Sequence, residues 1–257
     1  MSITFPTTDL KVPSGITALP SEMKRPGFGT LYGFDAQGGG GGVPYSNAVS
    51  IELDGADDNA TLASTFTLSG NKSFAGWFYF DSLSTRSIFA PIGAASFGST
   101  GFFVTNAGNV RFQTAAGRQT FIPIPILTTG TWTHLAVTGD GTNLILYVNG
   151  SQRGSTLTDG DWSIGDFFKT ATYYYFDGKA DELAFFASTL SSGDVSTIAN
   201  TGAASGSKGI DLSGYSPLHW WRMGDINGSS GTTIADQGSG GVAMTLVNGP
   251  TYSSSVP

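Results

Sequence analysis

Residues 130–150 read GTWTHLAVTGDGTNLILYVNG and hold two short runs of strand-forming residues on either side of a GDGTN turn. In the first run, positions 132, 134, 136 and 138 fall on one face of a strand, while Leu135 and Val137 fall on the other. Glycine and asparagine accept the positive φ angles of a tight turn, so the chain can reverse into residues 144–148. The stretch therefore predicts an antiparallel β-hairpin.

The same stretch contains His134 and Asp140, which could be interpreted as a catalytic pair. The turn, however, carries Asp140 away from His134 along the strand. A nucleophilic triad would also need a serine or cysteine that this spacing does not specify. We interpret His134 as a packed strand residue, and His219, beside Trp220 and Trp221, in the same way.

The composition of the 257-residue chain favours β structure with many turns, because it includes 37 glycines and 12% aromatic residues. Twelve basic residues against nineteen acidic ones give a formal charge of −7 without a basic cluster, which argues against nucleic-acid binding. The absence of cysteine excludes disulfides and thiolate metal sites.

The N-terminal residues MSITFPTTDLKVPSG lack the basic and apolar regions of a signal peptide, and no apolar window is long enough to span a bilayer. We therefore expect a soluble protein that is made in the cytoplasm and is not inserted into a membrane.

The chain divides into three parts by pattern. Residues 1–48 are rich in proline, include GGGGG at 38–42 and show no sustained hydrophobic period, which predicts an extended docking arm. The alternative is a partly disordered tail. Residues 49–202 consist of short alternating runs separated by turn residues, which predicts an all-β, antiparallel jelly-roll sandwich. Residues 203–257 form a Gly/Ser-rich link and further strands.

One short helix is expected within this sandwich, near residues 190–199. Ser191 can cap its first turn together with Asp194, Val195 and Ile198 share one face, and Gly202 can end the helix.

The hairpin closely resembles the central hairpin of laminin-G-like domains in the concanavalin A-like lectin/glucanase superfamily, which share a W-x-H-x-A-V strand and a Y-V-N-G return. Two further pieces agree in order, IELDGADDNATL at 51–62 and FDGKADELAFFASTLSSGDVSTIANTG at 176–202. The resemblance covers residues 49–202 and implies the fold, whereas members of the superfamily differ in function.

The C-terminal segment 219–257 looks like the opening of such a domain, placed here at the end of the chain. We expect these strands to close the sandwich of their own chain, as in a circular permutation. Closure of a neighbouring subunit's sheet is the alternative.

Calcium is the favoured cofactor, because carboxylate and amide oxygens crowd the loop after the first strand of this domain. Relatives in the family often bind calcium at loop aspartates, and the resemblance implies that Asp181 joins the loop residues. The candidate ligands are Asp54, Asp57, Asp58, Asn59 and Asp181. The alternative is a solvated acidic turn.

Carbohydrate binding would require exposed aromatic rings that stack on sugar faces. Tyr173, Tyr174 and Tyr175 cannot all be buried on one face of a strand, and Trp162 lies in a turn-rich stretch. These four residues are the candidates for a glycan site.

Glycosidase chemistry would need two carboxylates that face each other across a cleft. The chain has only three glutamates, Glu22, Glu52 and Glu182, and lacks the E-x-D-x-x-E and E-x-D-x-E strands of catalytic superfamily members. Asp181 and Glu182 are adjacent, so on a regular strand they would point to opposite faces. We therefore expect a protein without enzymatic activity.

Residues 220–225, 233–241 and 245–257 also resemble the endings of structural proteins of tailed bacteriophages, especially marine ones. This resemblance implies a virion structural protein, either a capsid decoration or a tail-fibre component. Its arm would dock onto other virion proteins, the chain would form a homo-oligomer, and the outward domain could bind a surface glycan. A free glycan-binding lectin is the alternative, and a polysaccharide-degrading enzyme comes third.

Overall fold

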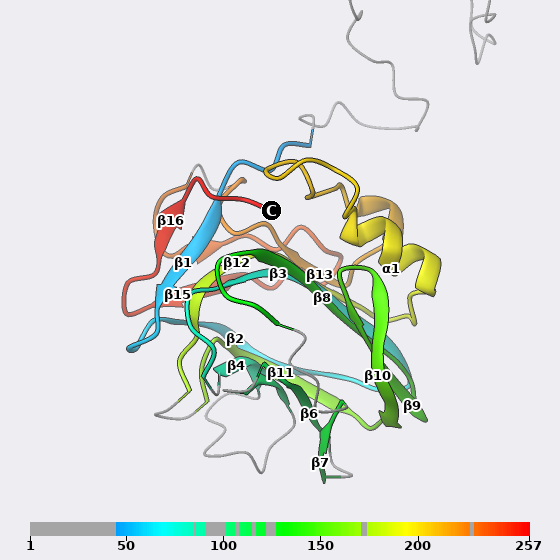
Figure 1. Ribbon diagram of the computed structural model, residues 1–257. Coiled ribbons are helices and arrows are strands. Elements are labelled where there is room, and N and C mark those ends of the chain that lie inside the picture. Colours follow the sequence, from blue (N-terminus) through cyan, green and yellow to red (C-terminus); the bar gives the residue numbers. More distant parts are fainter. Residues whose placement is uncertain are drawn as a thin grey trace, which may run out of the picture. The chain divides into compact units, whose positions relative to one another are not determined.

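The computed structural model describes residues 45–84, 86–90, 101–105, 108–114, 117–121, 127–170, 174–226 and 229–257. These residues form two antiparallel β-sheets packed face to face, with one short α-helix on the outside (Figure 1). The arrangement confirms the antiparallel sandwich predicted from the sequence. Residues 1–44 of the predicted arm (1–48) lie outside the described residues, so the conformation of the arm stays a prediction.

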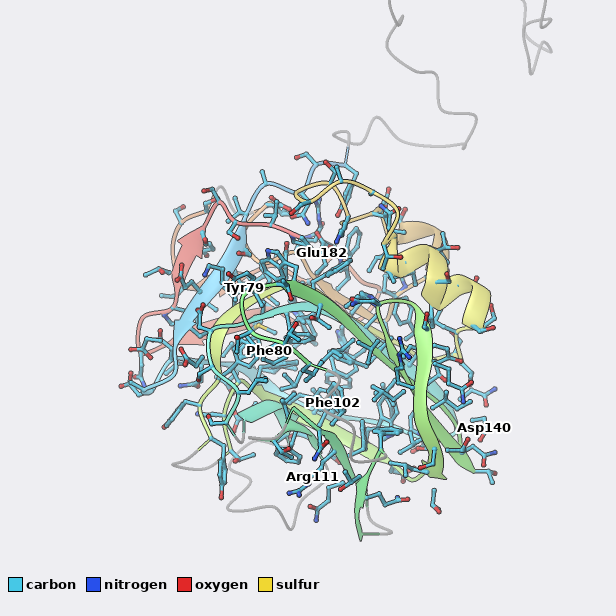
Figure 2. The ribbon with its side chains drawn as sticks, in the orientation of Figure 1. Tyr79, Phe80, Phe102, Arg111, Asp140 and Glu182 are labelled. Carbon is cyan, nitrogen blue, oxygen red and sulfur yellow. The ribbon has the colours of Figure 1, made fainter. Side chains whose placement is uncertain are left out.

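The predicted hairpin consists of β8 (Trp132–Asp140) and β9 (Asn143–Val148), which pair antiparallel. The Asp140 carboxylate accepts hydrogen bonds from the backbone N–H groups of Thr142 (2.8 Å) and Asn143 (2.6 Å). These bonds hold the pKa of Asp140 below its usual value. Asp140 lies at the edge of the molecule and stabilises a turn (Figure 2).

Sheet A is built around the hairpin. Its other strands are β1 (Ser50–Asp54), β3 (Asn71–Phe80), β10 (Ser151–Thr158), β12 (Asp177–Phe186), β13 (His219–Trp221) and β16 (Thr251–Ser253). The strand order is β10-β9-β8-β3-β12-β1-β16, and β13 pairs with β12 beyond the end of β1.

Sheet B lies below sheet A in Figure 1. Its strands are β2 (Asn59–Leu68), β4 (Arg86–Ala90), β5 (Gly101–Val104), β6 (Val110–Thr114), β7 (Gly117–Thr120), β11 (Trp162–Phe167), β14 (Thr233–Ile234) and β15 (Met244–Val247). They follow the order β14-β15-β2-β11-β4-β5-β6-β7.

Aromatic rings dominate the core between the sheets. Phe89 lies at its centre, with ring centroids 5.1 Å from both Phe74 and Phe185 in edge-to-face contacts. Figure 2 shows Phe80 and Phe102 in the same interior layer. Edge-to-face pairs add to the free energy gained from burying the rings themselves.

The outer face of sheet A carries a second buried cluster. Ala75, Ala136 and Ala184 are neighbours across three strands, which leaves room for side chains from a covering layer. Val195 and Ile198 of helix α1 (Ser192–Ala199) belong to this cluster, as do Leu212 and Trp220 from the segment that follows the helix.

Helix α1 begins as predicted. The Ser191 hydroxyl accepts a hydrogen bond from the backbone N–H of Asp194, whose carboxylate in turn accepts from the backbone N–H of Ser191. The helix ends at Asn200, which adopts a left-handed conformation with φ 41°, and not at Gly202. Within the described residues, no helix has both the length and the hydropathy that a membrane span requires.

The C-terminal strands pair within the chain, β13 with β12, β15 with β2 and β16 with β1. The Asp236 carboxylate ties β13 to the chain segment that follows it. It lies 2.6 Å from His219 Nδ1. It also accepts hydrogen bonds from the backbone N–H groups of Trp220, Gly238 and Val242. Burial raises the pKa of Asp236, but these bonds outweigh it and leave the pKa below its usual value. His219 is 3% exposed and is packed, as interpreted from the sequence.

A β-bulge interrupts β12 where its neighbour changes from β1 to β13. Glu182 has φ 51° there, so the alternation of side chains fails. The expectation that Asp181 and Glu182 point to opposite faces is therefore wrong, because Glu182 contacts Tyr45 while the Asp181 carboxyl interacts with Asn47 and Glu182. Glu182 accepts hydrogen bonds from Trp220 Nε1 (2.5 Å), Arg222 Nε (3.2 Å) and the Tyr45 hydroxyl (3.2 Å).

A buried ion pair holds the first residues of β3 in place. Lys72 Nζ lies 2.6 Å from Asp159 Oδ2, and both side chains are 0% exposed. Asp159 also accepts the backbone N–H of Gly141 (2.9 Å) and Trp162 Nε1 (3.1 Å). Gly139 lies so close to this carboxylate that a side chain there would collide with it.

We predict that Asp159→Ala lowers the free energy of unfolding by about 3–5 kcal/mol, because it leaves the Lys72 ammonium buried without a partner. Urea unfolding at pH 7 measures the change. Asp161→Ala, two residues away at an exposed position, serves as the control and should change the free energy by less than about 0.5 kcal/mol. A loss below 1 kcal/mol in the Asp159 variant would show that the pair does not stabilise the fold.

The second prediction concerns pH. Burial raises the pKa of Glu182 to about 7, so the folded chain binds its proton more tightly than the unfolded chain does. Glu182 therefore contributes stability that is complete below about pH 4.5 and is lost as the pH rises through about 7. Glu182→Gln keeps an acceptor for Trp220 and should flatten this loss.

Urea unfolding of both proteins at pH 5, 6, 7 and 8 tests this. Burial lowers the pKa of His134 to about 3, so this residue makes the free energy of unfolding rise with pH below about pH 6.5. His134 is present in both proteins, so its contribution cancels in the difference between their free energies. Parallel curves for the two proteins would mean that Glu182 does not titrate in this range.

Candidate functional site

One row of side chains crosses the outer face of sheet A over five successive strands. In register order it contains Thr251, Glu52, Lys179, Tyr79 and Trp132. Four strand spacings make the row about 19 Å long. Lys179 Nζ lies 3.2 Å from Glu52 Oε1 and 4.8 Å from the Tyr79 ring centroid, so it separates an acidic end of the row from an aromatic end.

The acidic end opens into a cavity of about 400 Å³, which we call the acidic cleft. Its acidic lining residues are Glu52, Asp54, Asp58, Asp81 and Asp177. Asp54 and Asp177 are register partners, and the backbone N–H of Asp81 donates to the Asp177 carbonyl (3.1 Å). Asp81 and Asp177 were not predicted from the sequence, since only the pairing of three strands brings them beside Asp54.

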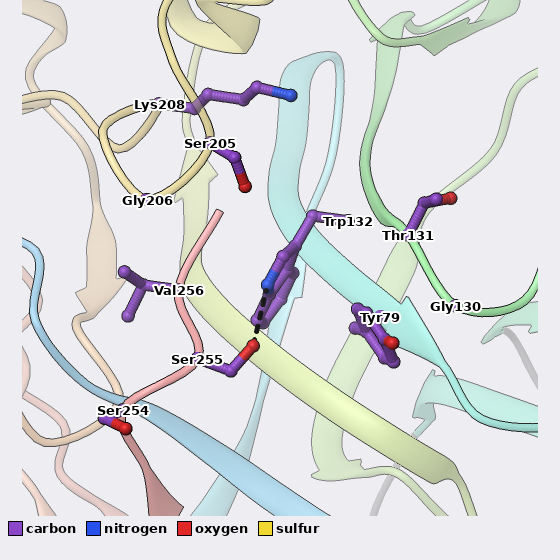
Figure 3. Close-up of a pocket in the computed structure, with 10 residues that line it drawn as sticks. All are labelled: Tyr79, Gly130, Thr131, Trp132, Ser205, Gly206, Lys208, Ser254, Ser255 and Val256. Atoms are coloured by element: carbon purple, nitrogen blue, oxygen red, sulfur yellow. Dashed lines mark hydrogen bonds between the residues drawn. The ribbon is translucent and has the colours of Figure 1, made fainter.

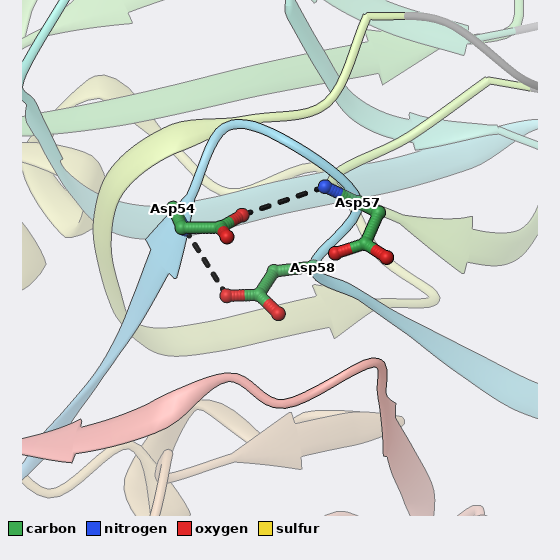
Figure 4. A group of neighbouring side chains, drawn as sticks. All are labelled: Asp54, Asp57 and Asp58. Atoms are coloured by element: carbon green, nitrogen blue, oxygen red, sulfur yellow. Dashed lines mark hydrogen bonds between the residues drawn. The ribbon is translucent and has the colours of Figure 1, made fainter.

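The loop after β1 brings three predicted ligands together, as Figure 4 shows. One carboxylate oxygen of each of Asp54, Asp57 and Asp58 lies within 4.8 Å of the other two. Asp54 Oδ1 accepts the backbone N–H of Ala56 (2.8 Å), and Asp58 Oδ2 accepts that of Asp54 (3.1 Å). Burial raises the pKa of Asp58, and the charges of Asp54 and Asp57 raise it further, so a cation would relieve a real repulsion.

The other two predicted ligands differ from each other. The Asn59 side-chain oxygen is buried and has no hydrogen-bond partner, so an oxygen that could coordinate a metal ion lies next to the loop. Asp181 lies four residues beyond Asp177 on β12, which is about 13 Å along the strand, and is fully buried. The donor set at Asp54, Asp57 and Asp58 fits a hard divalent cation, and Asp181 does not belong to it.

The aromatic end opens into a cavity of about 490 Å³, which we call the aromatic pocket (Figure 3). Tyr79 and Trp132 form its floor, with ring centroids 5.8 Å apart at an interplanar angle of 66°. Both rings are partly exposed. The Trp132 indole N–H donates to the Ser255 hydroxyl at 3.4 Å, which fixes one edge of the ring.

Two short segments wall the pocket, one at 205–208 and the other at 254–256. They are joined where the backbone N–H of Lys208 donates to the Pro257 carbonyl (3.0 Å). Serine hydroxyls and the Lys208 side chain surround the aromatic floor in Figure 3. Partly exposed rings with polar groups around them provide the chemistry for packing against a sugar ring.

The predicted aromatic candidates lie elsewhere. Trp162 is 0% exposed, because its strand turns it into the core, where its ring lies 4.9 Å from Phe112. Its assignment to a sugar site was wrong. Tyr174 and Tyr175 are partly exposed in the segment between β11 and β12 and do not line the pocket. Tyr173 lies outside the described residues.

The predicted packing role of His134 agrees with its position. It is 1% exposed, its ring meets Trp77 edge to face at 5.1 Å, and burial lowers its pKa to about 3. Glu182 and Asp181 are fully buried as well, so neither carboxylate is open to a substrate.

Comparison with solved structures supports the fold. A candidate carbohydrate-binding protein from Bacteroides ovatus superimposes with a TM-score of 0.58 at 16% identity, covering 82% of this chain and 60% of that one. This chain thus spans 60% of that protein's length. The heptameric SAP-like pentraxin of Limulus polyphemus gives 0.48 at 18% identity (60% and 82% coverage). The CBM40 of Ruminococcus gnavus IT-sialidase, bound to α2,3-sialyllactose, gives 0.45 at 13% identity (60% and 100%).

No match was found among curated proteins. A family model described as the concanavalin A-like lectin/glucanases superfamily, Laminin_G_3, matches residues 54–196, which is more than half of the chain. The match begins at the acidic loop, includes the hairpin at 130–150 and ends within α1. The chain therefore belongs to the laminin-G-like branch of the concanavalin A-like lectin/glucanase superfamily.

Proposed function

We propose that this chain is a carbohydrate-binding protein without enzymatic activity, and that the aromatic pocket is its ligand site. The observation that carries this proposal is the pair of partly exposed rings, Tyr79 and Trp132, in a cavity of about 490 Å³ with hydroxyl groups at its walls. The family is lectin-like in fold, and the similar Bacteroides ovatus protein is a candidate carbohydrate-binding protein, which agrees with this proposal.

The arrangement of the carboxylates argues against hydrolysis. Of the glutamates in the described residues, Glu182 is buried, and Glu52 is paired with Lys179. A glycosidase needs one carboxyl group as an acid and a second facing it across the bound sugar. The acidic cleft holds its aspartates side by side, which suits a cation better than such a pair.

We further propose that the loop after β1, beside the acidic cleft, binds calcium through Asp54, Asp57 and Asp58. Calcium would supply positive charge that offsets the mutual repulsion of these carboxylates and would hold the loop between β1 and β2 in place. The ligand set would differ from the one expected from the sequence by the loss of Asn59 and Asp181.

The virion role is a finer proposal. It rests on the predicted arm at 1–48 and on the C-terminal resemblance to bacteriophage structural proteins. It would include docking of the arm to other virion proteins and a homo-oligomer. A carbohydrate-binding outer domain is compatible with attachment of such a particle to a host surface, and equally with a free lectin.

Trp132→Ala should weaken glycan binding at least tenfold, because it removes the larger ring of the pocket floor. The measurement is binding of the purified chain to a glycan array, followed by titration of the best glycan. Tyr215→Ala is the matched control, since Tyr215 is also partly exposed on the outer layer but lies outside the pocket.

Unchanged affinity in the Trp132 variant would place the binding site elsewhere. Absence of binding by the wild-type chain to every glycan would refute carbohydrate binding itself. Release of reducing sugar from a bound polysaccharide would refute the non-enzymatic part of the proposal.

Millimolar calcium should raise the unfolding temperature of the wild-type chain by several degrees, because it binds the folded loop only. The double variant Asp57→Asn, Asp58→Asn should lose this shift, while the exposed control Asp161→Asn should keep it. An equal shift with magnesium, or a shift that survives the double variant, would count against a calcium site in the cleft.

A further inference from the structure

The charges around the aromatic pocket are unusual for this chain. Acidic residues outnumber basic ones by nineteen to twelve in the sequence, yet among the residues that the structure describes the pocket is lined by Lys208 and by no carboxylate side chain. The neighbouring acidic cleft, in contrast, is lined by five acidic residues. The two cavities on this face therefore differ in the sign of their lining charge.

Lys179 lies between the two cavities, and its ammonium is already paired with carboxylates. Its ammonium lies 3.2 Å from Glu52 Oε1 and 3.8 Å from Asp81 Oδ2, above the ring of Tyr79. It therefore partly shields the pocket from the carboxylates of the cleft. An ion-paired ammonium of this kind has little capacity left for a ligand.

Lys208 differs from Lys179 in its partners. Its ammonium lies 5.7 Å from the Trp77 ring centroid and makes no ion pair with any of the described residues. Its backbone is held by the hydrogen bond to Pro257, so the side chain starts from a fixed position. In Figure 3 it extends along the rim of the pocket, beside Trp132 and Ser205.

We propose that the aromatic pocket selects an acidic sugar, whose ring packs on Trp132 and whose carboxylate or sulfate pairs with Lys208. This inference rests on the proposed carbohydrate binding and adds the class of ligand. A negative group placed at Lys208 gains an unpaired ammonium, whereas the same group turned toward the cleft would meet carboxylates. The charge pattern thus favours an orientation in which the anionic group of the sugar lies at Lys208 and points away from the acidic cleft.

The test compares matched glycans that differ only in charge. Wild type, Lys208→Met and Lys208→Arg are applied to an array that pairs neutral sugars with their uronic or sialic acid counterparts and with their sulfated counterparts. Lys169→Met is the control, because Lys169 is also partly exposed and its loss changes the net charge equally, outside the pocket.

We expect wild type to prefer acidic members over neutral partners by about two- to fivefold, as one solvent-accessible ion pair allows. The preference should weaken as sodium chloride is raised. Lys208→Met should lower the binding of acidic members to the level of their neutral partners, whereas Lys208→Arg and Lys169→Met should retain the preference. The carboxylated and sulfated arms identify which anion the pocket takes.

Equal binding of neutral and acidic partners by wild type, or a preference that survives Lys208→Met, would overturn this inference while leaving carbohydrate binding intact. Loss of neutral binding in the Lys208→Met variant would assign Lys208 a structural role and would also overturn it. Failure of wild type to bind any glycan would overturn both proposals together.

Discussion

Strand β3 is buried on both of its faces, and this constraint determines how the rest of the chain is arranged. Phe74, Phe78 and Phe80 face the core, while Ala75 and Trp77 face outward and are buried as well. Leaving the outward side in water would cost about 25 cal/mol for each Å² of apolar surface. The chain after residue 186 meets this requirement, since α1 and the segments that follow it form a partial third layer over sheet A.

The aromatic pocket lies where this third layer ends. Trp77 is buried, with the Lys208 ammonium 5.7 Å from its ring centroid, whereas Tyr79 and Trp132 beside the segments at 205–208 and 254–256 stay partly exposed. The two rings meet only because β3 and β8 pair in one register, and a slip by one residue would turn Tyr79 into the core. The site therefore depends on the same strand pairing that builds the sandwich.

The sequence predicted the features that local patterns control. The hairpin at 130–150 and the capped helix at 192–199 each depend on residues close together in the chain. Features set by contacts between distant strands were missed. Asp81 and Asp177 join Asp54 only through strand pairing, and the bulge at Glu182 breaks an alternation that local reasoning assumes. Trp162 was misjudged because a turn-rich neighbourhood does not reveal which way the following strand faces.

The acidic cleft and the aromatic pocket share one structural element, the row in which Lys179 stands between Glu52 and Tyr79. A cation bound beside the cleft would repel the Lys179 ammonium, which lies 3.8 Å from Asp81. A ligand over Tyr79 would lie beside the same ammonium, which is 4.8 Å from the centroid of that ring. Coupling between two sites is reciprocal, so any effect of the cleft on affinity in the pocket must be matched by an equal effect of the pocket on the cleft. The free energy of that coupling is limited by the change in the interaction free energy of the Lys179 ammonium when it exchanges one partner for another.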